Sequence, residues 1–407
     1  MKAPGGRGVA ESMAAPRFEY FLETLGHPVE PGHPVWLRPL PMTRHGLDEP
    51  VPPGLRPDAS ISVGDYFQAV RAFLEGSGRD AFVRSLTRWG GDASAAETVL
   101  IFLAKHGEYY HPARVITEIK GVVFRWVVNV AVSTAGISLL FKEFALLEKL
   151  GREFPVSYVP EVYGAGEVDG GRGRTLAMFL GQWFSGFHEF HLTRDATSGE
   201  EGALVVWDPE NGRCQLNTAQ AQAVYYQVAR IHTHYLRLTD FVGIGAWHHA
   251  AGDFVVRLRE DHPEVRLITV REYLPLFRTR PATGDSVRSI KLYLEALLIF
   301  LLNLSIRTRL DRLDGTGDLA WSDSIAVQAT VAGLLDSLAE RTAPFELPLP
   351  MELLFRRYLA ACSKDDLLAL CMAIAEKNYA PGSLEFSLLG TCLEEHAAEL
   401  AVVFSQL

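Results

Sequence analysis

Cysteine and long hydrophobic runs are scarce in this chain. Its 407 residues include 4 cysteines, and no two of them form a C-x-x-C pair. This excludes a disulfide framework and a zinc ribbon, and it favours a reducing compartment. The most apolar segment, 296–302, is far shorter than the ~20 residues that span a bilayer, so we expect a buried helix there. The first residues show no apolar run of signal-peptide length, so we expect a soluble, cytoplasmic protein.

Basic residues are also fewer than acidic ones. Lys and Arg together number 39 against 49 for Asp and Glu, which gives a net charge of −10. Such a surface repels phosphate backbones and anionic lipid, and the sequence shows no basic patch that would offset this. We therefore expect no nucleic-acid partner and no membrane partner, which leaves a small molecule, a nucleotide or another protein.

The remaining composition is that of a globular protein, with 48% apolar and 22% charged residues. Residues 1–58 are rich in Pro and Gly and predict an extended arm or a loosely packed wrapper. Residues 59–106 form a predicted helical extension, in which Val99, Phe102 and Leu103 recur at helical spacing. We expect a sheet-rich N-lobe over 107–182 and a helical C-lobe over 183–407.

The order of the expected elements indicates an α+β fold with strands first and helices later. Segment 114–133 predicts strand, turn and strand, with Gly121 at the turn, and 139–150 predicts an amphipathic helix. Further strands are expected at 162–168 and 175–180. The last expected strands form two hairpins, at 203–207 with 213–216 and at 253–258 with 265–270.

This order, together with several short motifs, resembles the kinase-like superfamily, in particular its aminoglycoside phosphotransferase and choline kinase branch. KEFALLEKL at 142–150 is similar to that family's C-helix, and LAMFLG at 176–181 to the strand that enters its hinge. VARIH at 228–232 resembles the helix ending in L-A-x-L-H. AGDF at 251–254 stands where the family has H-G-D, and LITV at 267–270 where it has the metal-binding I-D.

The resemblance implies a two-lobed protein-kinase-like fold that binds ATP and Mg²⁺. It also implies roles for individual residues. The catalytic position is Asp253, and the nucleotide-binding or metal-binding positions are Asn129, Glu143, Met178, Leu180 and Thr269.

Several of these positions depart from the family pattern. The strand lysine is replaced by Asn129, or by Ser133 in another register, and the metal-binding aspartate by Thr269. The histidine before Asp253 is Ala251, and the metal-binding asparagine is Leu258. Phosphoryl transfer needs a cation on the phosphates and carboxylates on Mg²⁺. We therefore predict a degenerate site and a pseudokinase-type binding or scaffolding protein.

Two alternatives remain open. The first is an active small-molecule phosphotransferase in which Asp253 orients the acceptor hydroxyl and Lys105 or Arg257 replaces the strand lysine. The second is a metalloprotein that uses histidine pairs, namely His188 with His191, His232 with His234 and His248 with His249. On a helix, His188 and His191 would share one face. The H-E-x-x-H spacing is absent, so we interpret the histidines as buried and hydrogen-bonded among aromatic rings.

Each retained residue also has a purely structural interpretation. Glu143 could be a solvated or salt-bridged helix residue, Asp253 a turn or cap residue, and Asn129 an edge or bulge residue. The acidic segment 311–323 lacks calcium-loop register and predicts a solvated loop. We interpret the aromatic run 182–187 as core, with an apolar ligand wall as the alternative.

Overall fold

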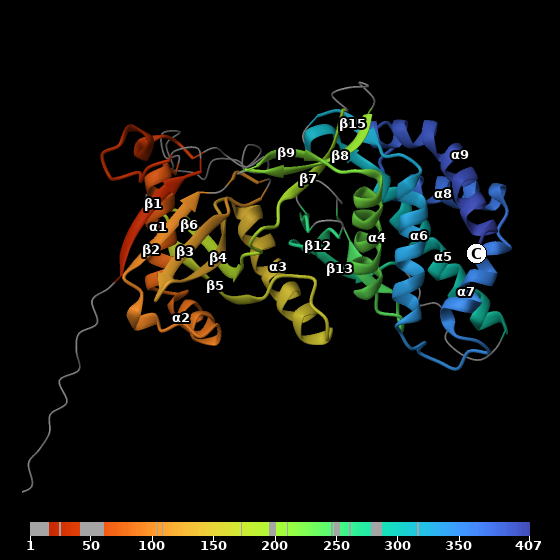
Figure 1. Ribbon diagram of the computed structural model, residues 1–407, viewed down its shortest axis with the longest axis horizontal. Coiled ribbons are helices and arrows are strands. Elements are labelled where there is room, and N and C mark those ends of the chain that lie inside the picture. Colours follow the sequence, from red (N-terminus) through yellow and green to blue (C-terminus); the bar gives the residue numbers. More distant parts are fainter. Residues whose placement is uncertain are drawn as a thin grey trace, which may run out of the picture. The chain divides into compact units, whose positions relative to one another are not determined.

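The computed structural model describes residues 16–23, 26–40, 61–103, 105–107, 109–171, 173–194, 201–209, 211–245, 247, 253–259, 262–277, 287–315 and 317–407. These residues form a mixed α+β fold with a sheet-rich N-terminal part and a helical C-terminal part (Figure 1). The chain divides into two compact units. Unit 1 comprises Met1–Glu148 and Glu161–Ser185, and unit 2 comprises Lys149–Pro160 and Gly186–Leu407.

Unit 1 is built on a six-stranded sheet with the strand order β1-β2-β3-β4-β6-β5. The strands are β1 (Arg17–Leu22), β2 (Thr98–Leu103), β3 (Ala113–Ile119), β4 (Val122–Ala131), β5 (Val162–Asp169) and β6 (Thr175–Gln182). Its helices are α1 (Val63–Glu75), α2 (Arg79–Arg88) and α3 (Thr134–Glu153), with short 3₁₀ turns at η1 (Pro34–Leu37) and η3 (Ala93–Ala95). β1 pairs with β2 in parallel, and the other neighbours are antiparallel.

Strands β3 and β4 confirm the predicted strand–turn–strand segment. Lys120 and Gly121 both have positive φ at the turn between them. Side chains alternate between the two faces of a strand, so Phe124, Trp126 and Val128 of β4 enter the core that α1 and α2 cover. Trp126 is fully buried, and its Nε1 donates to Ser85 Oγ of α2 at 2.9 Å. This hydrogen bond satisfies the one polar atom of a large apolar side chain.

The helical prediction for Val99, Phe102 and Leu103 is wrong, because these residues lie in β2. Their spacing of three and four residues fits a helix, but the segment TVLIFL is rich in β-branched and aromatic residues. Its side chains alternate between half-buried and buried, as in a strand with one face on the core. A run of this length is too short for spacing alone to distinguish the two structures.

The N-terminal segment is more than a loosely packed arm. In its described part, β1 pairs with β2 in continuous register from Arg17–Thr98 to Leu22–Leu103. Tyr20 and Val29 are buried in the same core as α1, and Tyr20 contacts the ring of Phe67 with centroids 5.2 Å apart. Strand β1 was not predicted because pairing between strands so distant in sequence leaves no local pattern.

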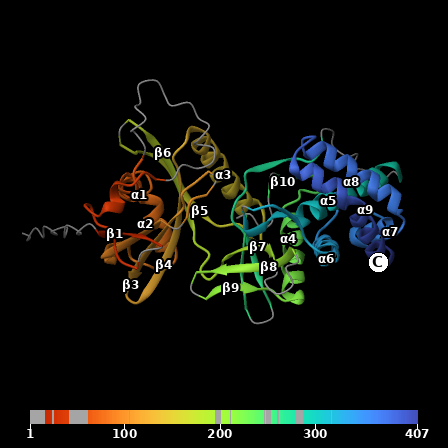
Figure 2. The same ribbon diagram turned by 90° about the horizontal axis from the view of Figure 1, so that it is seen from above.

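In unit 2, the described residues form four small sheets and most of the helices (Figure 2). Its strands are β7 (Glu189–Arg194), β8 (Glu201–Asp208), β9 (Gly212–Gln215), β10 (Val242–Gly245), β11 (Phe254–Arg257), β12 (Glu264–Leu267), β13 (Glu272–Pro275), β14 (Leu310–Arg312) and β15 (Leu319–Trp321). Its helices are α4 (Thr218–His234), α5 (Val287–Arg309), α6 (Ile325–Ala339), α7 (Met351–Ala360), α8 (Lys364–Asn378) and α9 (Leu384–Ser405), with a 3₁₀ turn η4 (Leu313–Gly315). The hairpins β8–β9 and β11–β12 confirm the two predicted strand pairs.

Helix α5 contains the most apolar segment of the sequence, and the expectation of a buried helix there is confirmed. By length and composition alone, this helix of 23 residues could also cross a membrane. Of its most apolar window, 61% is buried inside the protein, which is the condition of a core helix. Among the described residues, no other helix meets the same length and hydropathy test.

Candidate functional site

The candidate catalytic residue, Asp253, lies directly before β11 in unit 2. Its backbone carbonyl accepts a hydrogen bond from Ile268 N at 2.8 Å, which continues the ladder between β11 and β12. The residue is buried, with 1% of its surface exposed. A carboxylate at this depth requires a partner, because desolvation of an isolated charge is costly.

Two side chains from the segment after β12 provide partners for the Asp253 carboxylate. Thr269 Oγ1 donates a hydrogen bond to Asp253 Oδ1 at 2.5 Å. The guanidinium of Arg271 lies 2.8 Å from Oδ1 and 3.1 Å from Oδ2. Thr269 and Arg271 are two residues apart, and both side chains reach the Asp253 carboxylate from the same side of the backbone. The structure thus brings two predicted site residues, Asp253 and Thr269, into direct contact.

The surroundings of Asp253 do not fit a Mg²⁺ ion. This ion prefers carboxylate and phosphate oxygens in near-octahedral geometry. Here Arg271 supplies the positive charge that balances the carboxylate. The residue at the metal-binding position, Thr269, donates its hydroxyl proton to Asp253. Among the described residues, no group of three or more His, Cys, Asp or Glu side chains could hold a metal ion.

Asn129 and Glu143 both belong to unit 1. Asn129 lies in β4 opposite Phe179 of β6, in a register that runs without a shift from Trp126 to Ala131. It is half-buried in the middle of the sheet, so the interpretation as an edge or bulge residue is wrong. Side-chain alternation places Asn129 on the opposite face from Trp126 and the α1–α2 core.

Glu143 lies on α3, and its side chain is buried with 1% exposure. It is therefore not a solvated helix residue. The next residue, Phe144, contacts Phe179 of β6 with ring centroids 6.0 Å apart. Phe179 and Asn129 are cross-strand neighbours, so α3 lies on the face of the sheet to which Asn129 belongs.

Met178 and Leu180, the residues predicted to line a nucleotide pocket, lie in β6. Both side chains are fully buried in the core beneath α1 and α2, on the face opposite Asn129. β6 is a central strand, in which Leu180 pairs with Val128 on one side and Gly164 on the other. Any contact of these two residues with a ligand on the Asn129 face would have to use the backbone.

The chain around Gly107 and His111 is closed by its own contacts. Gly107 N donates to the carbonyl of Tyr110 at 2.9 Å, and His111 is completely buried. His111 Nδ1 lies 2.9 Å from Nδ1 of His106, and Tyr66 Oη donates to the carbonyl of His111. Burial, followed by the charge of His106, lowers the pKa of His111 to about 4. This pair was missed because its two members come from a loop without a periodic pattern.

The histidines of FHEFH lie at the start of strand β7, so they do not share the face that a helix would give them. In extended chain, residues three apart point to opposite faces. His188 lies 3.7 Å from Asp208 Oδ2, whereas His191 packs against the ring of Trp207 at 4.6 Å. His248 and His249 lie outside the described residues.

His232 and His234 lie in the last turn of α4 and differ in their surroundings. His232 is buried and stacks on Trp247 with centroids 3.9 Å apart, and burial lowers its pKa to about 3. His234 Nε2 lies 2.9 Å from the carbonyl of Val156. These contacts agree with the interpretation of the histidines as residues packed among aromatic rings.

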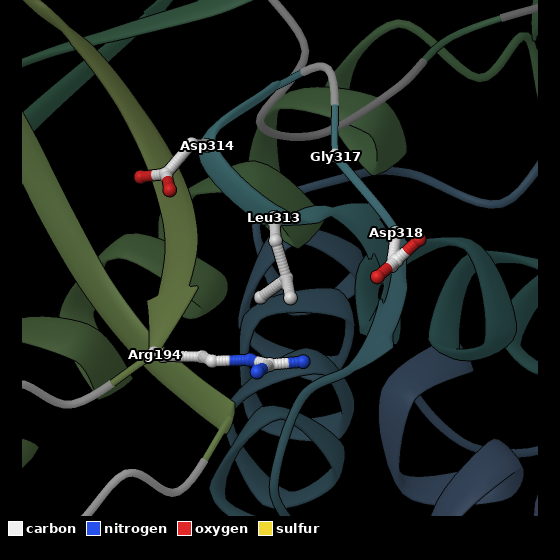
Figure 3. Close-up of a pocket in the computed structure, with 5 residues that line it drawn as sticks. All are labelled: Arg194, Leu313, Asp314, Gly317 and Asp318. Carbon is white, nitrogen blue, oxygen red and sulfur yellow. The ribbon is translucent and has the colours of Figure 1, made fainter.

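The segment 311–323, predicted to be a solvated loop, has exposed aspartates at Asp318 and Asp323 but a buried one at Asp311, and part of it lines a pocket. A cavity of about 400 Å³ is lined by Arg194, Leu313, Asp314, Gly317 and Asp318 (Figure 3). Asp314 accepts a hydrogen bond from Thr193 Oγ1 at 2.9 Å and lies 3.4 Å from the guanidinium of Arg213. Asp311 is buried, and its Oδ2 accepts from Leu192 N. Asp311 and Asp314 therefore form hydrogen bonds with strand β7, and Asp314 also pairs with Arg213 of β9.

The most consequential residue that sequence reasoning missed is Arg271. It follows Thr269 by two positions in the segment ITVRE. A basic residue two positions after the metal-binding position, in extended chain, could have indicated a cation on the same side of the backbone.

Matches to known proteins are found among solved structures. No family model matches the chain, and neither does any curated protein sequence. Among solved structures, the chain is similar to the one titled "WaaP in complex with acyl carrier protein". The TM-score is 0.28 and the identity 14%, over 66% of this chain and 86% of that chain. This similarity is weak.

Proposed function

We propose that this chain is a kinase-like protein with a degenerate phosphotransfer site, and that it acts as a pseudokinase-type binding or scaffolding protein. The observation that carries the proposal is the buried ion pair between Asp253 and Arg271. In the family that the sequence resembles, an aspartate at this position orients the acceptor hydroxyl. A carboxylate that already accepts from a guanidinium and from a threonine hydroxyl has fewer lone pairs left for a substrate.

The second argument concerns charge. In phosphoryl transfer, metal ions neutralise the phosphates and are themselves held by carboxylates. Arg271 places a fixed positive charge at the carboxylate of Asp253, the predicted catalytic position. A Mg²⁺ ion would have to displace this guanidinium and leave it without its partner. Such an exchange is unfavourable for a buried pair.

The third argument concerns unit 1. An amide at Asn129 provides no positive charge for a phosphate group, and the side chains of Met178 and Leu180 belong to the core. The arrangement favours recognition of a protein, or of a small molecule or nucleotide without bound metal. All four cysteines are free thiols, which fits a reducing compartment such as the cytoplasm.

The alternative of an active phosphotransferase has less support. Arg257, one of the two proposed replacements for the strand lysine, forms an ion pair with Glu264 on the neighbouring strand. Its guanidinium also lies over the ring of Phe187, 4.6 Å from the centroid. These contacts engage the side chain within the β11–β12 hairpin, where it stabilises the hairpin and Gly186–Phe187.

Titration calorimetry of the purified full chain with ATP, with and without Mg²⁺, tests the proposal, together with an assay for ADP release. We expect no Mg²⁺-dependent binding and no turnover. The double variant Thr269→Asp, Arg271→Gln adds a second carboxylate and removes the cation, and we expect it to bind Mg²⁺ where the parent chain does not.

A matched control is Arg266→Gln, which removes an arginine of the same hairpin that pairs with Glu264 rather than with Asp253. This control should leave Mg²⁺ binding as in the parent chain. Mg²⁺-dependent ATP binding with turnover in the parent chain, abolished by Asp253→Asn, would show that the active phosphotransferase is the correct alternative.

A further inference from the structure

A second cavity, of about 260 Å³, lies in unit 1 at the start of strand β4 and the end of strand β6. Its lining includes Trp89, which follows α2, Phe124 and Arg125 of β4, and Trp183, which follows β6. None of these residues belongs to the site described above. The interpretation of the aromatic run 182–187 as core is wrong at Trp183, which is half-buried and lines this cavity.

Packing against neighbouring aromatic rings fixes Trp89, one aromatic wall of this cavity. Trp89 stacks on the buried Trp126 with centroids 5.4 Å apart and an interplanar angle of 22°, and it meets Tyr163 edge-on at 5.6 Å. Trp126 is fixed in turn by its hydrogen bond to Ser85. Because these contacts already exist, a ligand would not have to order the wall on binding.

Trp183, the other aromatic wall, is held in place by Arg114. The Arg114 guanidinium lies 5.7 Å from its ring centroid and forms an ion pair with Glu23 at 3.2 Å. The charge of Arg114 is thus already balanced, and the ring of Trp183 remains as an apolar wall of the cavity.

Arg125 is the one arginine in the lining of the cavity. No ion pair or hydrogen bond joins its guanidinium to any residue that the structure describes. Arginines at comparable positions of this sheet are paired, as Arg114 is with Glu23. A guanidinium presents parallel N–H donors that match a planar carboxylate, and it does so best beside apolar walls.

Apolar surface adjoins this arginine. Val122 and Val123 also line the cavity, and they are 55% and 39% exposed. Exposed valines next to aromatic rings provide a surface that the apolar body of a ligand would cover. The volume lies below the range of about 300–1,000 Å³ for pockets that hold drug-sized ligands, so the ligand would be small.

We propose that this cavity binds a small aromatic carboxylate, whose ring lies between Trp89 and Trp183 and whose carboxylate pairs with Arg125. One arginine balances a single negative charge, and the protein as a whole carries −10. A monoanionic carboxylate is therefore favoured over a dianionic phosphate. The inference is independent of the function proposed for the Asp253 site.

Three matched probes test this inference: phenylacetate, its neutral amide phenylacetamide, and phenyl phosphate. Binding to the full chain is followed by saturation-transfer-difference NMR and titration calorimetry. We expect phenylacetate to bind with a Kd of about 1 mM, which is usual for a ligand of this size, and at least about tenfold more tightly than the amide. Phenyl phosphate should bind more weakly than phenylacetate.

Arg125→Gln should reduce phenylacetate binding to the level of the amide while leaving amide binding unchanged, which also shows that the variant folds. Trp89→Leu should weaken both. The control Arg84→Gln, at an exposed arginine of α2, should change neither. The inference is overturned if the acid and the amide bind equally, if phenyl phosphate binds best, if Arg125→Gln has no effect, or if nothing binds at ligand concentrations on the order of 10 mM.

Discussion

The Arg271 guanidinium lies 2.8 Å from Asp253 Oδ1, and the aspartate is almost completely buried. The two residues flank the hairpin β11–β12, one before its first strand and the other after its second. The pair therefore fastens the two ends of the hairpin together. It also places an arginine against the carboxylate that would take the catalytic position in the family that the sequence resembles.

Arg271→Met should lower the free energy of unfolding by about 3–5 kcal/mol, because it leaves a buried carboxylate without its counter-charge. Asp253→Asn in the same background should recover a large part of this loss. Thermal and urea unfolding of the two single variants and the double variant would measure the coupling. Equal stability of Arg271→Met and the parent chain would contradict the ion pair.

Thr269→Val should lower the free energy of unfolding by about 1.5–3 kcal/mol, because it removes a hydrogen bond to a charged acceptor. The hydroxyl of Thr269 lies 2.5 Å from Asp253 Oδ1, and valine has nearly the same shape without the donor. Thr269→Ser keeps the hydroxyl and serves as the matched control. A smaller effect for Val than for Ser would mean that the hydroxyl does not stabilise the carboxylate.

Stability should fall as the pH is lowered from about 6.5 to about 4, because of His111. Burial, and then the neighbouring His106, lower its pKa from the ordinary 6.5 to about 4. In this interval the unfolded chain binds a proton that the folded chain excludes, so stability is lost as pH falls, by up to about 3 kcal/mol from this residue. His232 and His396, each with a pKa of about 3, act in the same direction.

Urea unfolding at a series of pH values, with His111→Gln, measures this contribution. The variant should show a shallower dependence on pH between 4 and 6.5 than the parent chain. The exposed His262 provides the control, since His262→Gln should retain the steep dependence of the parent. Parallel pH profiles for the parent and His111→Gln would rule out the buried, neutral state of His111.

Gly164→Ala should destabilise unit 1 by about 1–3 kcal/mol. A Cβ at Gly164 of β5 would lie 2.6 Å from the Cβ of Ala81 on α2, so the helix would have to move off the strand. Ala81→Gly should rescue the variant. By contrast, Gly390→Ala in α9 meets nothing within 4 Å and should stabilise the protein by up to about 1 kcal/mol. Differential scanning calorimetry of these variants tests both signs.

The elements that could be predicted from sequence are those fixed by local patterns. Alternating β-branched residues around Gly121 predicted β3 and β4, and the apolar periodicity of 139–150 predicted α3. The hairpin β11–β12 was predictable because both strands are short apolar runs close together in sequence. In these cases the sequence pattern that predicts an element lies within the element itself.

The parts that could not be predicted depend on partners that are distant in sequence or specific to one side chain. The contact of Thr269 with Asp253 followed from the resemblance of both positions to one family site, whereas Arg271 belongs to no motif. Trp183 was misassigned because an aromatic run has the same composition in a core and in the wall of a cavity. Whether such a run lies in a core or lines a cavity depends on how it packs against other parts of the chain, and the run's own sequence does not specify this.

The parallel pairing of β1 with β2 has a consequence for the order of events during synthesis. Residues 17–22 leave the ribosome early, but their partner strand begins only at Thr98. Until Thr98–Leu103 has been made, Phe18, Tyr20 and Phe21 have no strand against which to lie. Strand β1, at the edge of the sheet, is therefore made before α1 and α2 but can pair only after β2 has been made. This delay favours slow completion of the unit 1 sheet over rapid local folding.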